Sequence, residues 1–242
     1  MEEMKIHTAG DSSVLIEFGQ EISPEINAKI TAFVHLMKAQ HVEGVKDMIP
    51  AFTSLLINYD PRVVNYGALK ERLEKLLKLE VSQETAPSRI FDIPVCYGGE
   101  YGPDLENIAM HANLSTQEVI DIHSREDYLI YMLGFLPGFS YLGGLDERIH
   151  TPRLANPRIK IPAGIVGIGG SQTGIYPLDS PGGWQLLGLT PVKTYDPNRG
   201  IPILFEAGDY IHFVPVTEKD FLEIKEQVNQ GTYECVIRQK GV

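Results

Sequence analysis

Glycine and proline are concentrated in one stretch of this chain, and that stretch restricts what the chain can fold into. Between Gly134 and Gly188 lie twelve of the 23 glycines, in the run GFLPGFSYLGGLDERIHTPRLANPRIKIPAGIVGIGGSQTGIYPLDSPGGWQLLG. Glycine and proline at this density predict tight turns and close approaches of the backbone. Uncharged hydrogen-bonding and stacking side chains alternate with them, so we interpret the run as a ligand-binding wall. These side chains are Gln172, Thr173, Tyr176, Trp184 and Gln185.

The length of 242 residues allows one large domain or two small ones, and the sequence favours two. Residues 81–88, VSQETAPS, are polar and short-chained and include a proline, which is typical of a linker. We therefore predict an α+β protein with an N-terminal α/β domain over residues 1–84 and a second domain over residues 89–242.

Strand and helix signals alternate through the first domain. Ser23 followed by Pro24 predicts a helix start, and Asp60 followed by Pro61 predicts a second helix that ends near Leu79. The order βαββα resembles a ferredoxin-like half-open sandwich. Its strands are expected at residues 6–18, with an interrupting turn at 10–12, and at 45–49 and 54–59.

The second domain combines short helices with many short strands. Ser115 and Glu118 have the spacing of a capping box, and Thr217 is placed to cap a last helix. Short apolar runs broken by glycine and proline predict a β-barrel or a sandwich. Strands are expected at 91–97, 128–133, 165–168, 175–178, 184–187, 204–205, 210–216 and 233–237, and a short helix at 103–113.

The net charge of −11 restricts the partners of this chain. Divided between Pro87 and Ser88, the chain has 9 basic and 13 acidic residues in its first part and 12 and 19 in its second. Clusters of lysine and arginine that would bind phosphate backbones are missing, so neither nucleic acid nor an anionic membrane is an expected partner.

The sequence also predicts a cellular location. The N-terminus lacks the signature of a secretory signal, and no apolar run reaches the roughly 18 residues of a membrane span. Cys96 and Cys235 are far apart in strand-like contexts, which favours free buried thiols. We therefore expect a cytoplasmic protein.

Several common motifs are missing or incomplete. There is no phosphate loop, and the glycines of residues 167–170 lack the spacing of a dinucleotide fingerprint. They are expected to serve tight turns, with an anion-binding nest as the alternative. The seven histidines show no metal-ligand spacing, so no metal is predicted. Ser140 lacks the context of an activated nucleophile and is interpreted as structural.

A local positive cluster stands out in this acidic chain. Arg153, Arg158 and Lys160 are close together, and such a cluster either receives a carboxylate or phosphate or lies in a solvated loop with ion pairs. His123 lies near the end of the helix that Ser115 starts. Packing at the helix C-terminus is expected for it, and a role in a site is the alternative.

The polar residues of the glycine-rich run need hydrogen-bond partners if they are buried. Backbone groups and a small amide-like ligand are equally consistent with the sequence. The residues concerned are Gln172, Thr173, Tyr176 and Gln185.

Four segments together resemble one known family. They are YGGEYGPDLE, GFLPGFSYLGGL, PRLANPRIKIPAGIVGIGGSQTGIYPLDSPGGWQLLG and AGDYIHF, and GDSSVLIEFG in the N-terminal part is also similar. The family comprises the Kip-type inhibitors, also called allophanate hydrolase subunit 1 or the B subunit of 5-oxoprolinase. The resemblance covers nearly the whole chain and implies a cyclophilin-like β-barrel after the linker.

The resemblance implies two functions. The first is that of a component, not catalytic alone, of an ATP-dependent 5-oxoprolinase that opens 5-oxoproline to L-glutamate. Its partners would be the 5-oxoprolinase C subunit, the Kip-type antagonist, and the LamB/YcsF-like A subunit, with ATP used by the assembled complex at a site not identified on this chain. The alternative is inhibition of sensor histidine kinase autophosphorylation in sporulation control.

A hypothesis for the chemistry follows from the first function. Phosphorylation of the lactam oxygen would make its carbon electrophilic, which requires donors around that oxygen and a cation for the substrate carboxylate. We assign amide contacts to Gln172, Thr173 and Gln185, and packing or a hydrogen bond to Tyr176. Arg158 or Lys160 is assigned to the carboxylate, and no catalytic residue is identified.

Overall fold

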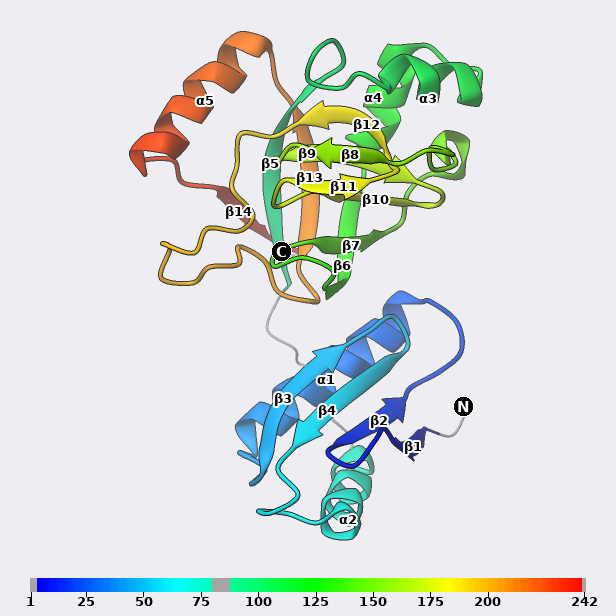
Figure 1. Cartoon of the computed structure of the whole chain (residues 1–242), viewed down its shortest axis with the longest axis vertical. Helices are drawn as coiled ribbons and strands as arrows, with labels where there is room; N and C mark the ends of the chain where they lie inside the picture. Colours follow the sequence, from blue (N-terminus) through cyan, green and yellow to red (C-terminus); the bar gives the residue numbers. More distant parts are fainter. Residues whose placement is uncertain (1–3, 80–87, 241–242) are drawn as a thin grey trace. The chain divides into compact units, whose positions relative to one another are not determined.

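The computed structural model describes residues 4–79 and 88–240 and divides the chain into two compact units, Met1–Ala86 and Pro87–Val242 (Figure 1). The domain limits predicted at residues 84 and 89 enclose a linker that falls almost wholly outside the described residues. Those limits therefore stay a prediction. No helix within the described ranges is long and apolar enough to cross a membrane.

The first unit is an antiparallel sheet packed against two helices. Its strand order is β1-β2-β4-β3, and the expected turn at Gly10 makes a hairpin of β1 and β2. Ser23 caps α1, accepting a hydrogen bond from the Ile26 backbone N–H at 3.2 Å. Buried apolar residues of sheet and helices form one core. The elements are β1 Lys5–Thr8, β2 Ser13–Glu17, α1 Pro24–Ala39, β3 Val45–Pro50, β4 Ser54–Tyr59 and α2 Tyr66–Leu77.

The prediction that Asp60 starts the second helix is wrong. Asn65 caps α2 instead, and its Oδ1 accepts from the Ala68 backbone N–H at 3.0 Å. The Asp60 carboxylate accepts from the Arg62 backbone N–H at 3.1 Å and pairs with the Arg62 guanidinium at 2.8 Å. Asp60 therefore holds a turn that precedes the helix.

The second unit contains a closed barrel of seven strands. Around the barrel the order is β12-β9-β10-β7-β6-β13-β5, and β12 pairs back to β5 at Cys96 and Tyr97. The last strand, β14, pairs with the other part of the same edge of β5, where Gln239 lies opposite Arg89. The strands are β5 Arg89–Tyr97, β6 Asp127–Leu133, β7 Ser140–Gly143, β9 Ile165–Gly169, β10 Gln172–Ile175, β12 Gln185–Leu189, β13 Tyr210–Pro215 and β14 Val236–Gln239.

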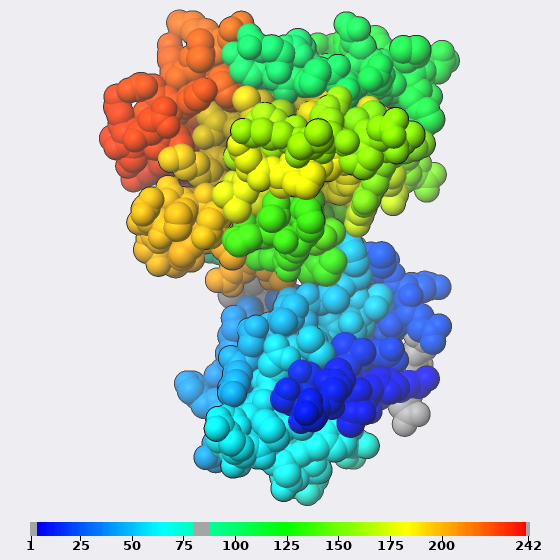
Figure 2. All heavy atoms as spheres, viewed as in Figure 1, coloured from blue at the N-terminus to red at the C-terminus, as the bar shows by residue number. Residues whose placement is uncertain are grey.

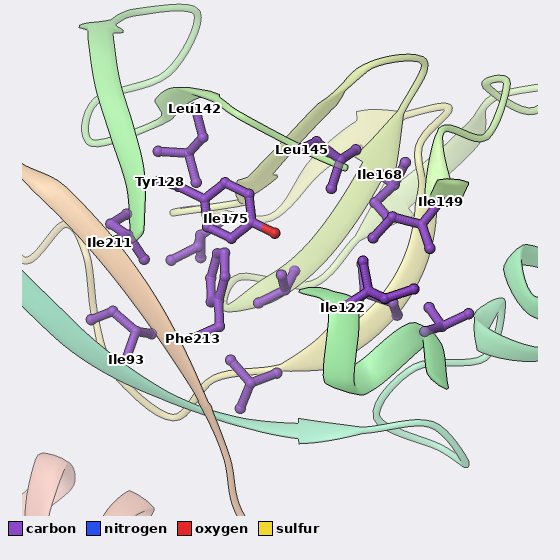
Figure 3. Packing of buried hydrophobic residues seen from close by; sticks show 14 of the residues in the cluster. Ile93, Ile122, Tyr128, Leu142, Leu145, Ile149, Ile168, Ile175, Ile211 and Phe213 are labelled. Atoms are coloured by element: carbon purple, nitrogen blue, oxygen red, sulfur yellow. The ribbon is translucent and has the colours of Figure 1, made fainter. Parts of the chain in front are cut away.

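Aliphatic and aromatic side chains fill the barrel (Figure 3). Tyr128 and Phe213 are fully buried among them, with ring centroids 5.5 Å apart. The strand expected at 204–205 is not formed: Phe205 packs edge-on against Phe91, with centroids 5.1 Å apart. Residues 204–205 are thus apolar because Phe205 is packed in the core. The strand expected at 175–178 lies earlier, at β10, because Pro177 has no backbone N–H to extend the ladder.

The helices of the second unit are fixed by their caps. Both capping boxes form, between Ser115 and Glu118 and between Thr217 and Asp220. They start α4 and α5 where the sequence predicts. The helical segments are α3 Leu105–Ala112, α4 Thr116–His123, η1 Glu147–Ile149 and α5 Glu218–Gln230.

A small two-stranded sheet lies outside the barrel strands. It consists of β8 Arg158–Ile161 and β11 Ser180–Gly182. A separate hydrophobic cluster includes residues of β8 and of the barrel strands. The cluster contains Phe139, Ile161, Ile165, Tyr176, Trp184 and Leu186.

Candidate functional site

The Trp184 side chain packs directly against three glycines of the sheet. A Cβ on Gly169 would lie 2.3 Å from Trp184 Nε1, and one on Gly174 would lie 3.2 Å from Cζ3 of the same ring. A Cβ on Gly167 would lie 3.4 Å from the Trp184 Cβ. Among residues 167–170, only Gly170, with φ of 71°, adopts the left-handed conformation that the hairpin turn requires. Close packing therefore explains more of this glycine motif than turns do.

Trp184 and Tyr176 belong to an aromatic cluster. Their rings are edge-on to each other with centroids 6.0 Å apart, and both are edge-on to Phe139. Tyr176 is buried, and its burial raises the pKa of the phenol. Its hydroxyl also forms a hydrogen bond with the Trp184 backbone, so Tyr176 has both of the roles that the sequence left open.

Arg153, Gln172 and Trp184 form a group that we call the Arg153 site. The Arg153 guanidinium carbon lies 5.8 Å from the centre of the Trp184 ring. Gln172 is the cross-strand partner of Gly169, so its side chain leaves the sheet on the face where the indole N–H lies. Within residues 4–79 and 88–240, neither the indole N–H nor the Gln172 amide has a protein hydrogen-bond partner, and no carboxylate pairs with Arg153.

The chemistry of the Arg153 site suits a ligand that carries a carboxylate, an amide group or both. A guanidinium supplies charge-assisted donors in a planar fork, and the indole adds one N–H donor. The Gln172 amide both donates and accepts. Arg153 is exposed and Gln172 is half-buried, so a ligand can reach both.

The two cations that the sequence assigned to a carboxylate are already paired. Arg158 donates to the buried Asp104 carboxylate at 2.7 Å and to the Trp184 carbonyl at 3.3 Å. Lys160 pairs with the exposed Asp179 at 2.7 Å. Arg153 belongs to the same cluster, but no role was predicted for it. Within the described residues, Arg158 and Lys160 differ from Arg153 in having an acidic partner. Those partners are distant in sequence, so only the fold shows which cations are paired.

Gln185 has an unfilled hydrogen-bonding position. Its Nε2 donates to the Pro152 carbonyl at 3.0 Å, while its Oε1 is buried and has no partner among the described residues. Buried acceptors of this kind are costly unless a donor reaches them. Because Pro152 precedes Arg153, this acceptor is tied to the segment that carries the guanidinium.

Thr173 and His123 meet inside the barrel. Thr173 Oγ1 donates to the Gly167 carbonyl at 3.1 Å, so it accepts from His123 Nε2 at 2.8 Å. His123 Nδ1 then accepts from the Tyr97 hydroxyl at 2.8 Å. We infer this tautomer from the network. A continuous chain of hydrogen bonds thus links β5, α4 and β10 to the carbonyl of Gly167.

His123 packs at the C-terminal end of α4, as the sequence predicts. It is the last residue of that helix, and it is fully buried and stacks on Phe213 with ring centroids 4.6 Å apart. Burial lowers the pKa of His123 from 6.5 to about 3. The imidazole is therefore neutral at physiological pH and serves the interior network.

Ser140 and the two cysteines have structural surroundings. The Ser140 hydroxyl is fully buried, and no base contacts it within the described ranges. Cys96 and Cys235 are free thiols, the first buried and the second partly buried, and burial raises the pKa of Cys235 to about 11. Across the described residues no group of three or more His, Cys, Asp or Glu is arranged to hold a metal ion.

A family match extends over most of both units. Residues 4–205 match the family described as carboxyltransferase domain, subdomain C and D, and the chain belongs to this family. The curated relatives identify the branch more closely. The 5-oxoprolinase B subunit of Bacillus subtilis (strain 168) is 44% identical over 93% of this chain and 98% of its own length. Its counterpart from Escherichia coli O157:H7 is 40% identical over 90% and 99%. The resemblance seen in the sequence is thus confirmed.

Solved structures support the same fold. TTHA0988 has a TM-score of 0.76 at 37% identity, covering 84% of this chain and 40% of its own length. The urea amidolyase of K. lactis has a TM-score of 0.78 over 98% of this chain and 16% of its own length. At 24% identity, that second likeness shows the fold alone. This chain spans less than half of either protein.

Proposed function

We propose that this chain is the B subunit of an ATP-dependent 5-oxoprolinase that works together with other subunits. The observation that carries the proposal is the 44% identity to a 5-oxoprolinase B subunit over 98% of that relative's length. An amide hydrolase acting on 5-oxoproline must recognise one carboxylate and one ring amide. The Arg153 site offers donors and an acceptor of those types.

We propose a division of roles at this site. Arg153 binds the substrate carboxylate, in preference to Arg158 and Lys160, because its guanidinium has no carboxylate partner within the described residues. Gln172 contacts the ring amide. The remaining predicted contacts, by Thr173 and Gln185, are indirect, since both side chains are buried and bind backbone carbonyls.

The reaction we propose balances in atoms and charge. The lactam oxygen attacks the γ-phosphorus of ATP, ADP leaves, and the ring carbon becomes electrophilic. Water adds to that carbon, and the carbon–nitrogen bond breaks with a proton going to nitrogen. A second water then displaces phosphate from the resulting acyl phosphate, so glutamate, ADP and phosphate are the products. This chain contributes substrate orientation, and the A and C subunits supply the remainder of the reacting groups.

Two further proposals concern the fold of each unit. We infer that the N-terminal unit is ferredoxin-like, supported by the antiparallel order β1-β2-β4-β3, in which β1 forms one edge. We infer that the barrel is cyclophilin-like, supported by its seven closed strands. Neither likeness by itself implies an activity, because function resides in the side chains of the site.

The test is 5-oxoproline-dependent ATP hydrolysis, measured with this chain alone and after mixing with its A and C partner subunits. We expect turnover only in the complete mixture. Omitting this chain from an otherwise complete mixture should abolish turnover. Full turnover without it would contradict the proposal, and so would none in the complete mixture. The second result would favour the alternative, which inhibition of kinase autophosphorylation would then test.

A further inference from the structure

A cavity of about 220 Å³ lies between α5 and residues 189–194. Helix α5, orange to red in Figures 1 and 2, lies on the outside of the barrel. Apolar side chains of both segments line the cavity, among them Leu189, Val192, Phe221 and Val228. No residue of the Arg153 site lines it. The cavity is therefore distinct from the Arg153 site.

Helix α5 carries a lysine on its cavity side. Phe221, Lys225 and Val228 follow one another at helical spacing and all three line the cavity. Lys225 Nζ lies 5.8 Å from the centre of the Phe221 ring, and no carboxylate pairs with it in the described part of the chain. Lys225 is exposed, so among the described residues it is a cation without an anionic partner beside the cavity.

The second wall adds another cation. Lys193 also lines the cavity, and its Nζ is 3.9 Å from Asp196 Oδ2, a distance at which the attraction is weak. No aspartate or glutamate lines the cavity, although the chain has 32 acidic residues against 21 basic ones. The local charge is thus opposite in sign to that of the whole chain.

Neutral hydrogen-bonding groups are also present. Thr194 lines the cavity and is 1% exposed, and its hydroxyl has no hydrogen-bond partner among the described residues. Asn229, next to Val228 on α5, adds an amide. An apolar lining with a few polar groups is typical of a small-molecule site.

We propose that this cavity binds a small carboxylate with an apolar body. Lys193 and Lys225 pair with the carboxylate, and the apolar lining contacts the hydrocarbon part. Thr194 and Asn229 supply neutral hydrogen bonds. The site is separate from the Arg153 site and does not depend on the function proposed for it.

The experiment compares two probes of equal shape, isovalerate and isovaleramide, by titration calorimetry and saturation-transfer NMR on the full chain. We expect isovalerate to bind about tenfold more tightly, because only the carboxylate forms charge-assisted bonds. Lys225→Met should reduce that preference, because Lys193 alone then pairs with the carboxylate, and should leave the amide's affinity unchanged. Lys219→Met is the matched control, since Lys219 on the same helix pairs with Glu223 at 3.7 Å and does not line the cavity.

A second variant distinguishes binding inside the cavity from electrostatic attraction to the protein surface. Val228→Trp should fill the space and abolish binding of both probes, while thermal unfolding confirms that the variant is folded. Equal affinity for the two probes would overturn the proposal. So would an unchanged preference for isovalerate in Lys225→Met, isovalerate binding that survives Val228→Trp, or no detectable isovalerate binding to the unaltered chain.

Discussion

Gly169 has no side chain because the Trp184 indole occupies the space where a Cβ would project. We expect Gly169→Ala to lower the free energy of unfolding by about 1–3 kcal/mol, since the ring must shift within a packed cluster. Gly200→Ala is the control, because a Cβ there meets nothing within 4 Å. Urea unfolding of both variants checks this. Equal free energies of unfolding for the two variants would show that the packing of the indole against Gly169 does not contribute to stability.

Arg153 is the residue on which the proposed substrate contact depends. Arg153→Met keeps an apolar contact with Trp184 but removes the charge, so we expect the KM for 5-oxoproline to rise about tenfold or more in the assembled enzyme. Arg148→Met is the control, because Arg148 pairs with Asp146 at 2.6 Å. Steady-state ATP hydrolysis measures both. An unchanged KM in Arg153→Met would remove this residue from the site.

His123 makes stability depend on pH. Its pKa falls from 6.5 to about 3 on folding, so below pH 6.5 the unfolded chain binds a proton that the folded chain does not. Stability is therefore lost as pH falls from 6.5 towards 3, by about 1.4 kcal/mol per pH unit. Between pH 7 and pH 5 we expect a loss of about 2 kcal/mol.

The matched variant for this pH effect is His123→Gln, which retains a hydrogen-bonding side chain without a titrating ring. Its urea midpoint should fall less between pH 7 and pH 5 than that of the unaltered chain. The carboxylates with lowered pKa values, such as Asp146 at about 2, titrate below this window. Parallel losses in both proteins would show that His123 is not the responsible group.

At the scale of elements, Asp104 joins three segments at the start of α3. It accepts from Arg158 of β8 at 2.7 Å and from the Leu186 backbone N–H of β12 at 2.7 Å. We expect Asp104→Asn to lower the free energy of unfolding by about 2 kcal/mol, because this carboxylate is buried. Asp179→Asn, which breaks an ion pair of equal length at the surface, should change stability little. Chemical unfolding of both variants decides, and equal losses would contradict the prediction.

Elements with local start signals could be predicted from the sequence, and others could not. α4 and α5 begin at capping boxes that four consecutive residues encode, so their starts are confirmed. The start of α2 was missed because Asp60 uses its carboxylate to bind Arg62. Strands β7, β8 and β11 were missed because each has at most four residues, too few to show alternation.

The candidate site was only partly predictable for a related reason. Gln172 was identified because a polar residue in an apolar run needs a partner. Choosing Arg153 over Arg158 required knowing that Asp104, 54 residues away in sequence, neutralises Arg158. Likewise, the contact between His123 and Thr173 spans 50 residues. Such pairings depend on barrel closure and leave no trace in local spacing.

For the whole molecule, the described hydrophobic clusters predict independent folding of the two units. The core of Val14, Phe33 and Leu73 lies entirely in the first unit, and the two other clusters lie entirely in the second. We expect residues 88–242 produced alone to unfold cooperatively at nearly the same temperature as in the full chain. Calorimetry and amide NMR spectra test this. A fragment without dispersed amide signals would contradict the prediction.

The pairing of β14 with β5 has a consequence for how such a domain is carried in longer proteins. Arg89 begins β5, the first barrel strand, and Gln239 ends β14, and the two are cross-strand partners. The polypeptide thus enters and leaves the barrel at one point on its rim. A host chain can accommodate the domain as an insertion between two neighbouring positions, without separating them and without disturbing a strand.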